Sequence, residues 1–173
     1  MTSRAELRVT SDELRALLGA ANPEPCSILR VAPSPIDVTG VPARGAARQA
    51  LAVTENERLA LVVARLIPEK RVALALQALT QLEGVSVIVV GDGPEFEALR
   101  ARFPRVRFTG RLPRPETLRF IAAADVLVSA SPDEGAPTVV REARQLGVPV
   151  VAVAAGDLAA WARTDPGIRL VGG

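Results

Sequence analysis

From residue 59 onward, short apolar runs rich in β-branched residues alternate with longer stretches in which apolar residues recur every three or four positions. The first pattern is typical of buried strands, and the second of amphipathic helices that cover a sheet. Six strands are predicted at residues 59–64, 85–90, 106–109, 125–129, 149–153 and 168–171. Helices are predicted between them at residues 71–82, 95–102, 114–123, 138–146 and, with a weaker pattern, 157–163.

This alternation predicts an α/β fold in which six strands form a Rossmann-like, doubly wound parallel sheet. Because crossover connections between parallel strands are right-handed, the expected strand order is 3-2-1-4-5-6. Ligands of such sheets bind beyond the carboxyl ends of the strands, at the point where the order reverses. In this chain that point lies in the loops after Ala64 and Ser129, where we expect the functional site.

The first 58 residues do not follow the repeat. Residues 11–19 predict a capped helix and residues 28–31 a short strand, which the proline-rich segment 32–42 follows. We interpret this region as a linker that leads into the sheet domain.

Composition favours one domain and excludes several classes of partner. The chain has 173 residues, of which 49% are hydrophobic, enough for a single core. Its 21 basic and 19 acidic side chains are interspersed, which is too balanced for a nucleic-acid-binding surface. No apolar run approaches the roughly 18 residues that span a bilayer, and the amino terminus lacks a signal-peptide core. We therefore expect a cytoplasmic protein without a transmembrane segment.

Cys26 is the only cysteine, and the chain has no histidine. These two facts exclude an internal disulfide, a Cys/His zinc site and any Ser-His or Cys-His catalytic pair. The chemistry must therefore come from carboxylates, arginines, lysine, hydroxyls or the backbone.

A pair of cations follows the first predicted strand. Arg65 and Lys70 lie five positions apart in a loop that runs into a helix. Helix amino termini favour anions, arginine grips phosphate in a bidentate way and lysine adds a point charge, so the pair suits a diphosphate. Two solvated surface charges would give the same pattern. However, Lys70 is the only lysine in a chain that otherwise uses arginine.

The motif Gly91-Asp92-Gly93-Pro94 follows the second strand. Its glycines let the backbone turn sharply and approach a ligand before the next helix begins. A dinucleotide-binding fingerprint would need a third glycine at Phe96, and no Walker lysine follows, so dehydrogenase and P-loop functions are disfavoured. Taken alone, the motif fits a tight strand-to-helix turn better than a ligand site.

The most informative segment, residues 129–143, follows the fourth strand and enters the next helix. Glu134 lies in its loop and Glu142 in the second helical turn. Eight residues of ideal helix rotate through about 800° and rise about 12 Å, a net offset of about 80°, so both carboxylates can reach one cleft. There they would accept hydrogen bonds from sugar and ribose hydroxyls. Two solvated glutamates explain the spacing alone equally well.

Six segments in this order resemble the carboxyl-terminal domain of the family 4, or group 1, retaining glycosyltransferases: RLIPEK, GDGP, FTGRLPRPE, AADVLVSAS, EGAPTVVREA and LGVPVVAV. The resemblance covers roughly residues 28–171, and the E-x7-E element is specific in this context. It implies one half of a GT-B fold, the half that binds the nucleotide-sugar donor.

The resemblance also implies roles for individual residues. The catalytic set would be Arg65 and Lys70, which neutralise the donor diphosphate, and Glu134, which faces the transferred sugar. Glu142 would bind the ribose hydroxyls. The other donor-binding residues would be Gly91 at the floor of the pocket, Arg111 and Leu112 with their backbone at the base, and Gly135, Ala136, Pro137 and Thr138 at the helix start that faces the phosphates.

Members of this family transfer a hexosyl group from a nucleotide sugar to a saccharide or lipid acceptor, with retention of configuration and without a metal ion. The resemblance therefore implies a hexosyltransferase of polysaccharide biosynthesis that uses no cofactor and takes a UDP-sugar as donor. A peripheral position at the inner membrane face is expected for the complete enzyme.

Several features depart from the family pattern. Ala64 and Arg71 replace glycines beside the cation pair, and residues 155–159 keep only the second glycine of the family's GG-x-P-E loop. We interpret residues 1–25 as a remnant of the amino-terminal domain, and residues 26–173 as a donor domain that lacks its carboxyl-terminal helices.

These omissions carry expectations about partners. The reaction needs both halves to exclude water and position the acceptor, so the isolated chain should bind donor weakly and catalyse poorly without an acceptor-binding domain or partner chain. The uncovered apolar face also favours a homo-oligomer.

Two other functions are considered. A non-catalytic GT-B-like module that completes or regulates a separate transferase chain would explain the missing domain and the altered loop at 155–159. A GT-B-fold epimerase acting on a nucleotide sugar is disfavoured by the absence of histidine and by the EGAP sequence.

Overall fold

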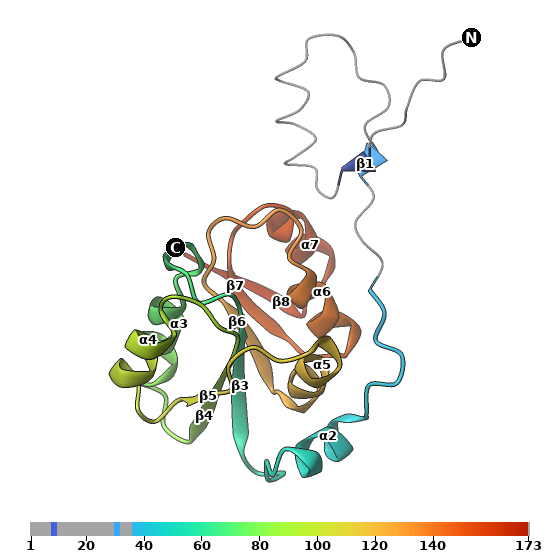
Figure 1. The fold of residues 1–173 in the computed structure, drawn as a ribbon. Coiled ribbons are helices and arrows are strands. Elements are labelled where there is room, and N and C mark those ends of the chain that lie inside the picture. The colour runs from blue at the N-terminus through green and yellow to red at the C-terminus, as the bar shows by residue number, and fades with distance from the viewer. Residues whose placement is uncertain (1–7, 10–29, 32–35, 173) are drawn as a thin grey trace, which may run out of the picture.

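The computed structural model describes residues 8–9, 30–31 and 36–172. Six parallel strands form the central sheet in Figure 1: β3 (Arg58–Val63), β4 (Val85–Val90), β5 (Arg107–Phe108), β6 (Val126–Ser129), β7 (Val150–Val153) and β8 (Ile168–Val171). Their order is β5-β4-β3-β6-β7-β8, which is the predicted order 3-2-1-4-5-6. The prediction of a Rossmann-like α/β sheet is therefore confirmed.

Helices cover both faces of the sheet (Figure 1), and a separate core lies under each layer. On one face lie α3 (Val72–Leu79) and α4 (Phe96–Arg102); on the other lie α5 (Arg114–Ala123), α6 (Thr138–Gln145) and α7 (Leu158–Thr164). Along β3, Leu59 and Leu61 pack into the core under α5 and α6, whereas Ala60 and Val62 pack under α3. This alternation explains the continuous apolar run, because both faces of the strand are buried. None of the described helices is long and apolar enough to cross a membrane.

The elements before β3 differ most from the prediction. A helix that the pattern did not predict, α2 (Arg44–Ala50), packs against α5, and only Ala47 and Arg48 of this helix are buried. Two short strands, β1 (Arg8–Val9) and β2 (Arg30–Val31), pair in parallel, and β2 corresponds to part of the strand predicted at 28–31. The helix predicted at 11–19 lies outside the described residues.

The buried side chain of α2 is an arginine that joins this helix to the amino-terminal ends of β3 and β6. Arg48 has a fully buried side chain, and its Nη1 donates to the Ala123 carbonyl at 2.8 Å. Its Nη2 donates to the carbonyls of Thr54, at 2.5 Å, and Glu57. The same guanidinium lies 3.4 Å from Asp125 Oδ2. Hydrogen bonds to several carbonyl groups compensate for burial of the charge.

Asp125 completes this junction from the side of β6. Its Oδ2 accepts a hydrogen bond from the Leu59 amide at 2.7 Å, and its Oδ1 lies 2.5 Å from Arg44 Nη2. Burial raises the pKa of the Asp125 carboxyl, but the Leu59 amide and the guanidinium groups of Arg44 and Arg48 lower this pKa by more, so that it lies below its ordinary value. The carboxylate therefore stays ionised at neutral pH and links the two central strands to α2.

Replacing Arg48 by alanine is expected to lower the free energy of unfolding by about 3–5 kcal/mol, because the change leaves carbonyl groups and a carboxylate without their buried partner. Urea unfolding followed by circular dichroism measures this loss. The matched control is Arg44→Ala, which removes a half-exposed cation from the same carboxylate and should cost about 1 kcal/mol or less. Equal losses in the two variants would contradict the structural role of the buried arginine.

Candidate functional site

Two loops at the carboxyl ends of β3 and β4 are locked together through their backbones. The Leu66 amide donates to the Asp92 carbonyl at 2.9 Å, and the Glu95 amide donates to the Leu66 carbonyl at 3.0 Å. Gly91, with φ +146°, lies so close to Ala64 that a Cβ would stand 1.8 Å from the Ala64 carbonyl oxygen. Because any side chain would clash there, only glycine permits this approach of the two loops.

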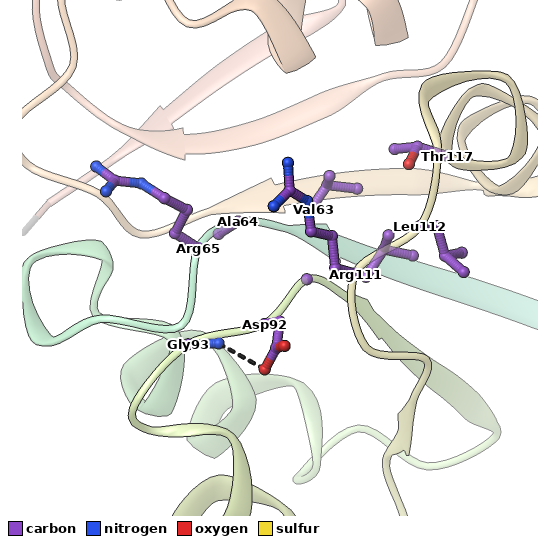
Figure 2. A pocket seen from close by; sticks show the side chains of 10 residues that line it. Val63, Ala64, Arg65, Asp92, Gly93, Arg111, Leu112 and Thr117 are labelled. Atoms are coloured by element: carbon purple, nitrogen blue, oxygen red, sulfur yellow. Dashed lines mark hydrogen bonds between the residues drawn. The ribbon is translucent and has the colours of Figure 1, made fainter.

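The locked loops border a cavity of about 570 Å³, shown in Figure 2. Its lining includes Val63, Ala64, Arg65, Gly91, Asp92, Arg111, Leu112 and Thr117. In Figure 2 the guanidinium groups of Arg65 and Arg111 project to the same side of the strand ends, and both side chains are exposed. The volume is within the range of small-molecule binding sites, and two cations from separate loops would favour an anionic ligand.

A second, smaller cavity of about 40 Å³ adjoins the first and shares Val63 and Ala64 with it. In its lining, Lys70 Nζ lies 2.5 Å from Glu134 Oε1 and 3.5 Å from Ser131 Oγ. Lys70 is the last residue of a 3₁₀ turn, Pro68–Lys70, that precedes α3, whereas Ser131 and Glu134 follow β6. The reversal of strand order at β3 therefore brings the only lysine of the chain against Glu134 across 64 positions of sequence.

Glu142 lies on α6 and lines neither of these two cavities. Its side chain is 8% exposed, and its Oε1 accepts hydrogen bonds from Arg114, whose Nε and Nη2 both lie 3.0 Å away. Such a partner offsets the cost of taking a carboxylate out of water. The two glutamates of the E-x7-E element therefore pair with different cations, Glu134 with Lys70 and Glu142 with Arg114.

The loop between Glu134 and α6 is supported by the loop after β7. Gly156, with φ +49°, lies so close to this loop that a Cβ would stand 1.9 Å from the Glu134 carbonyl oxygen and 2.2 Å from that of Gly135. The Asp157 amide donates to the Gly135 carbonyl at 3.0 Å. No side chain caps the first turn of α6, which begins after Pro137. Gly156, the glycine of the 155–159 loop that the family pattern retains, thus positions the segment that carries Glu134.

The structure brings together some of the predicted site residues and separates others. Arg65, Gly91, Arg111 and Leu112 line one cavity, and Lys70 and Glu134 form a pair in the adjoining one. Gly135, Ala136, Pro137 and Thr138 lead from this pair into α6, while Glu142 lies apart from both cavities.

Among the polar residues of this region that were not assigned a role from the sequence are Arg114, Thr117 and Ser131. Ser131 and Arg114 fall inside motifs that were considered, but their partners are distant in sequence. Ser131 contacts Lys70, 61 positions away, and Arg114 contacts Glu142, 28 positions away. Thr117 belongs to the exposed or half-buried side of α5, which the helical pattern does not distinguish from other surface positions.

Residues 43–163 match the family described as glycosyl transferases, group 1. The chain is 33% identical over 162 residues to the D-inositol 3-phosphate glycosyltransferase of Mycobacterium tuberculosis (strain ATCC 25177 / H37Ra). This match covers 86% of this chain and 34% of that protein. The chain is 36% identical over 110 residues to TuaC of Bacillus subtilis (strain 168), named for teichuronic acid biosynthesis, which covers 63% of this chain and 28% of TuaC. The chain spans about a third of the length of these curated relatives.

Solved structures give the same result. Sucrose-phosphate synthase from Thermosynechococcus elongatus matches with a TM-score of 0.81 at 25% identity, over 95% of this chain and 44% of that one. Anabaena HepE in complex with UDP matches with a TM-score of 0.76 at 26% identity, over 97% of this chain and 50% of that one. A further HepE structure contains UDP-glucose. The family resemblance predicted from the sequence is thereby confirmed.

Replacing Gly156 by alanine is expected to lower the free energy of unfolding by well over 2 kcal/mol, because the new Cβ would collide with two carbonyl oxygens as well as strain the backbone. The matched control is Gly147→Ala, which also has a left-handed φ, +77°, but has open space around its Cα and should cost about 1–2 kcal/mol. Urea unfolding of both variants measures the difference. If both lost the same stability, the Gly156 contact would have no special role in holding the Glu134 loop.

Proposed function

Because this chain belongs to the group 1 glycosyltransferases, we propose that its sheet domain binds the nucleotide-sugar donor of a retaining hexosyltransferase. This enzyme transfers a hexosyl group to a saccharide or lipid acceptor without a metal ion. The observation that carries the proposal is the cavity beyond β3 and β4, which contains Arg65 and Arg111 and adjoins the Lys70–Glu134 pair. The UDP bound to HepE supports a uridine nucleotide as the first ligand to test.

The diphosphate is assigned to the junction of the two cavities. Arg65 lines the larger cavity, Lys70 lines the smaller one, and both come from the loop after β3. The first backbone amides of α6, which follow Gly135 in the chain, are not capped by a side chain. They add hydrogen-bond donors at the positive end of the helix dipole. Two cations and a helix start can together neutralise a diphosphate, which is the task that a magnesium ion performs in other transferases.

The nucleoside is assigned to the side of the cavity formed by the loop after β5. Gly91 has no side chain and leaves room for the base. The backbone of Arg111 and Leu112 can form hydrogen bonds with the edge of the base. Glu142 is assigned to the ribose, since a carboxylate accepts hydrogen bonds from two neighbouring hydroxyl groups. Reaching Glu142 requires the nucleotide to extend from the cavity toward α6.

The transferred sugar is assigned to Glu134. In the reaction, the bond between the anomeric carbon and the diphosphate oxygen breaks, and the acceptor hydroxyl bonds to the same face of the sugar and gives its proton to the departing diphosphate. The growing negative charge on the diphosphate would be stabilised by Arg65, Lys70 and the α6 amides. Each such preorganised donor is worth roughly 3–4 kcal/mol of transition-state stabilisation.

Acceptor binding is assigned to a second domain or a partner chain. The donor site lies at one edge of the sheet and is open, whereas transfer without hydrolysis needs a site from which water is excluded. We therefore expect weak donor binding and little transfer by residues 36–172 alone, and full activity only when an acceptor-binding unit closes over the cavity.

A non-catalytic module that completes or regulates a separate transferase chain is the second candidate. The observation that favours it is that Lys70 and Glu142 are already paired with Glu134 and Arg114, so neither residue needs a ligand to balance its charge. Such a module would associate stably with an acceptor-domain chain and would have no affinity for nucleotides.

Calorimetric titration with UDP, GDP and ADP in the presence of EDTA tests the donor-site proposal. We expect binding of one nucleotide, UDP, and a loss of about tenfold or more in affinity for Lys70→Ala, because a charged hydrogen-bond donor to phosphate is lost. The matched control is Arg58→Ala. It removes an exposed cation from the amino-terminal end of β3, the strand that precedes the Lys70 loop, and should leave the affinity unchanged. Absence of binding to all three nucleotides by the folded chain would favour the non-catalytic module.

A further inference from the structure

Arg114 combines an exposed position with contacts that fix it at two points. It lies in the first turn of α5, and its side chain is 51% exposed. Its Nε and Nη2 both lie 3.0 Å from Glu142 Oε1, and Nη2 also donates to the Asp37 carbonyl at 2.8 Å. Ordering an exposed arginine costs side-chain entropy, and these two contacts hold the guanidinium in one place against that cost.

The second anchor is itself ordered by a local turn. The Thr39 amide donates to Asp37 Oδ1 at 2.8 Å, which holds the backbone of this segment in a defined turn. The Asp37 carbonyl therefore presents a fixed acceptor to Arg114. The guanidinium is held between the segment that leads into α2 and the carboxylate on α6.

The contact with Glu142 is one-sided. Every hydrogen bond and ion pair that the described residues make with the Glu142 carboxylate goes to Oε1 and comes from Arg114. The described part of the chain therefore leaves Oε2 available as an acceptor. Because the carboxylate is 8% exposed, loss of Arg114 would leave a buried charge uncompensated, which favours rotation of the side chain away from this position.

We propose that Arg114 is a positioning residue that determines recognition of the ribose 2′-hydroxyl, by holding Glu142 through Oε1 and leaving Oε2 for the nucleoside. The inference rests on the proposed ribose role of Glu142. Arginine suits this task because its planar fork can direct Nε and Nη2 to one oxygen while Nη2 also reaches a carbonyl. A lysine ammonium has the charge but lacks the fork, so it should restore only part of the effect.

The test compares the affinities for UDP and 2′-deoxy-UDP, measured calorimetrically on the same preparation of each variant. The wild-type chain should bind UDP about tenfold or more tightly than 2′-deoxy-UDP, because a hydroxyl bonded to a carboxylate is lost. Arg114→Met should bring this ratio close to one. Arg114→Lys should give an intermediate ratio. A partly unfolded preparation does not obscure the result, since a reduced active fraction affects both ligands equally.

Two further variants separate the possible causes. Arg119→Met removes an exposed arginine from the same helix and should leave the ratio at its wild-type value. Glu142→Gln should also bring the ratio close to one. The double variant Arg114→Met/Glu142→Gln should have the same ratio as Glu142→Gln alone, because the arginine acts through the glutamate.

The outcomes distinguish this inference from the function on which it rests. A wild-type ratio in Arg114→Met, together with a lost ratio in Glu142→Gln, would overturn the role of Arg114 and leave the donor site intact. A wild-type chain that binds UDP without discriminating against 2′-deoxy-UDP would overturn the ribose role of Glu142 and the inference with it. A wild-type chain that binds neither nucleotide would overturn the proposed function itself.

Discussion

Strand β3 hydrogen-bonds to β4 along one edge and to β6 along the other, and the proposed site depends on this reversal of strand order. Its residues alternate between two buried cores, so a shift of one position in register would place every side chain of the strand on the wrong face. The junction of Arg48, Asp125 and the Leu59 amide holds the other end of β3 and β6 in place. The loops after β3, β4 and β6 are therefore fixed at one edge of the sheet, where residues distant in sequence can act on one ligand.

The charged residues at this edge divide into two sets. Lys70 with Glu134, and Arg114 with Glu142, are paired within the chain and have fixed positions before any ligand arrives. Arg65 and Arg111 are exposed, and neither forms an ion pair within the part of the chain that the structure describes. The exposed arginines would supply the attraction for an anionic donor, whereas the paired groups would supply an ordered arrangement of donors and acceptors. Such an arrangement requires little reorganisation during a reaction, which is the condition under which electrostatic stabilisation is largest.

The six strands of the central sheet, the five helices after β3 and the sheet order could be predicted from the sequence because buried parallel strands leave continuous apolar runs and crossover handedness leaves one order. Helix α2 could not, since its main buried side chain is Arg48 and burial of an arginine leaves no apolar stripe. The motif residues could be named, but their partners could not: Arg114 meets Glu142, and Gly156 meets Glu134, only through tertiary packing. The assigned roles of the site residues, the division into domains and the homo-oligomer remain predictions.

The most direct measurement is a titration of the isotope-labelled chain with UDP, followed by amide chemical shifts. The account predicts that the shifts concentrate on Arg65, Gly91, Arg111, Leu112 and the start of α6, with little change at the opposite edge of the sheet. That edge contains a separate cavity of about 340 Å³ lined by residues such as Gln81, Gly84 and Arg105, which serves as the internal reference. Shifts confined to that reference region, or no shifts at saturating UDP, would contradict the assignment of a donor site beyond β3 and β4.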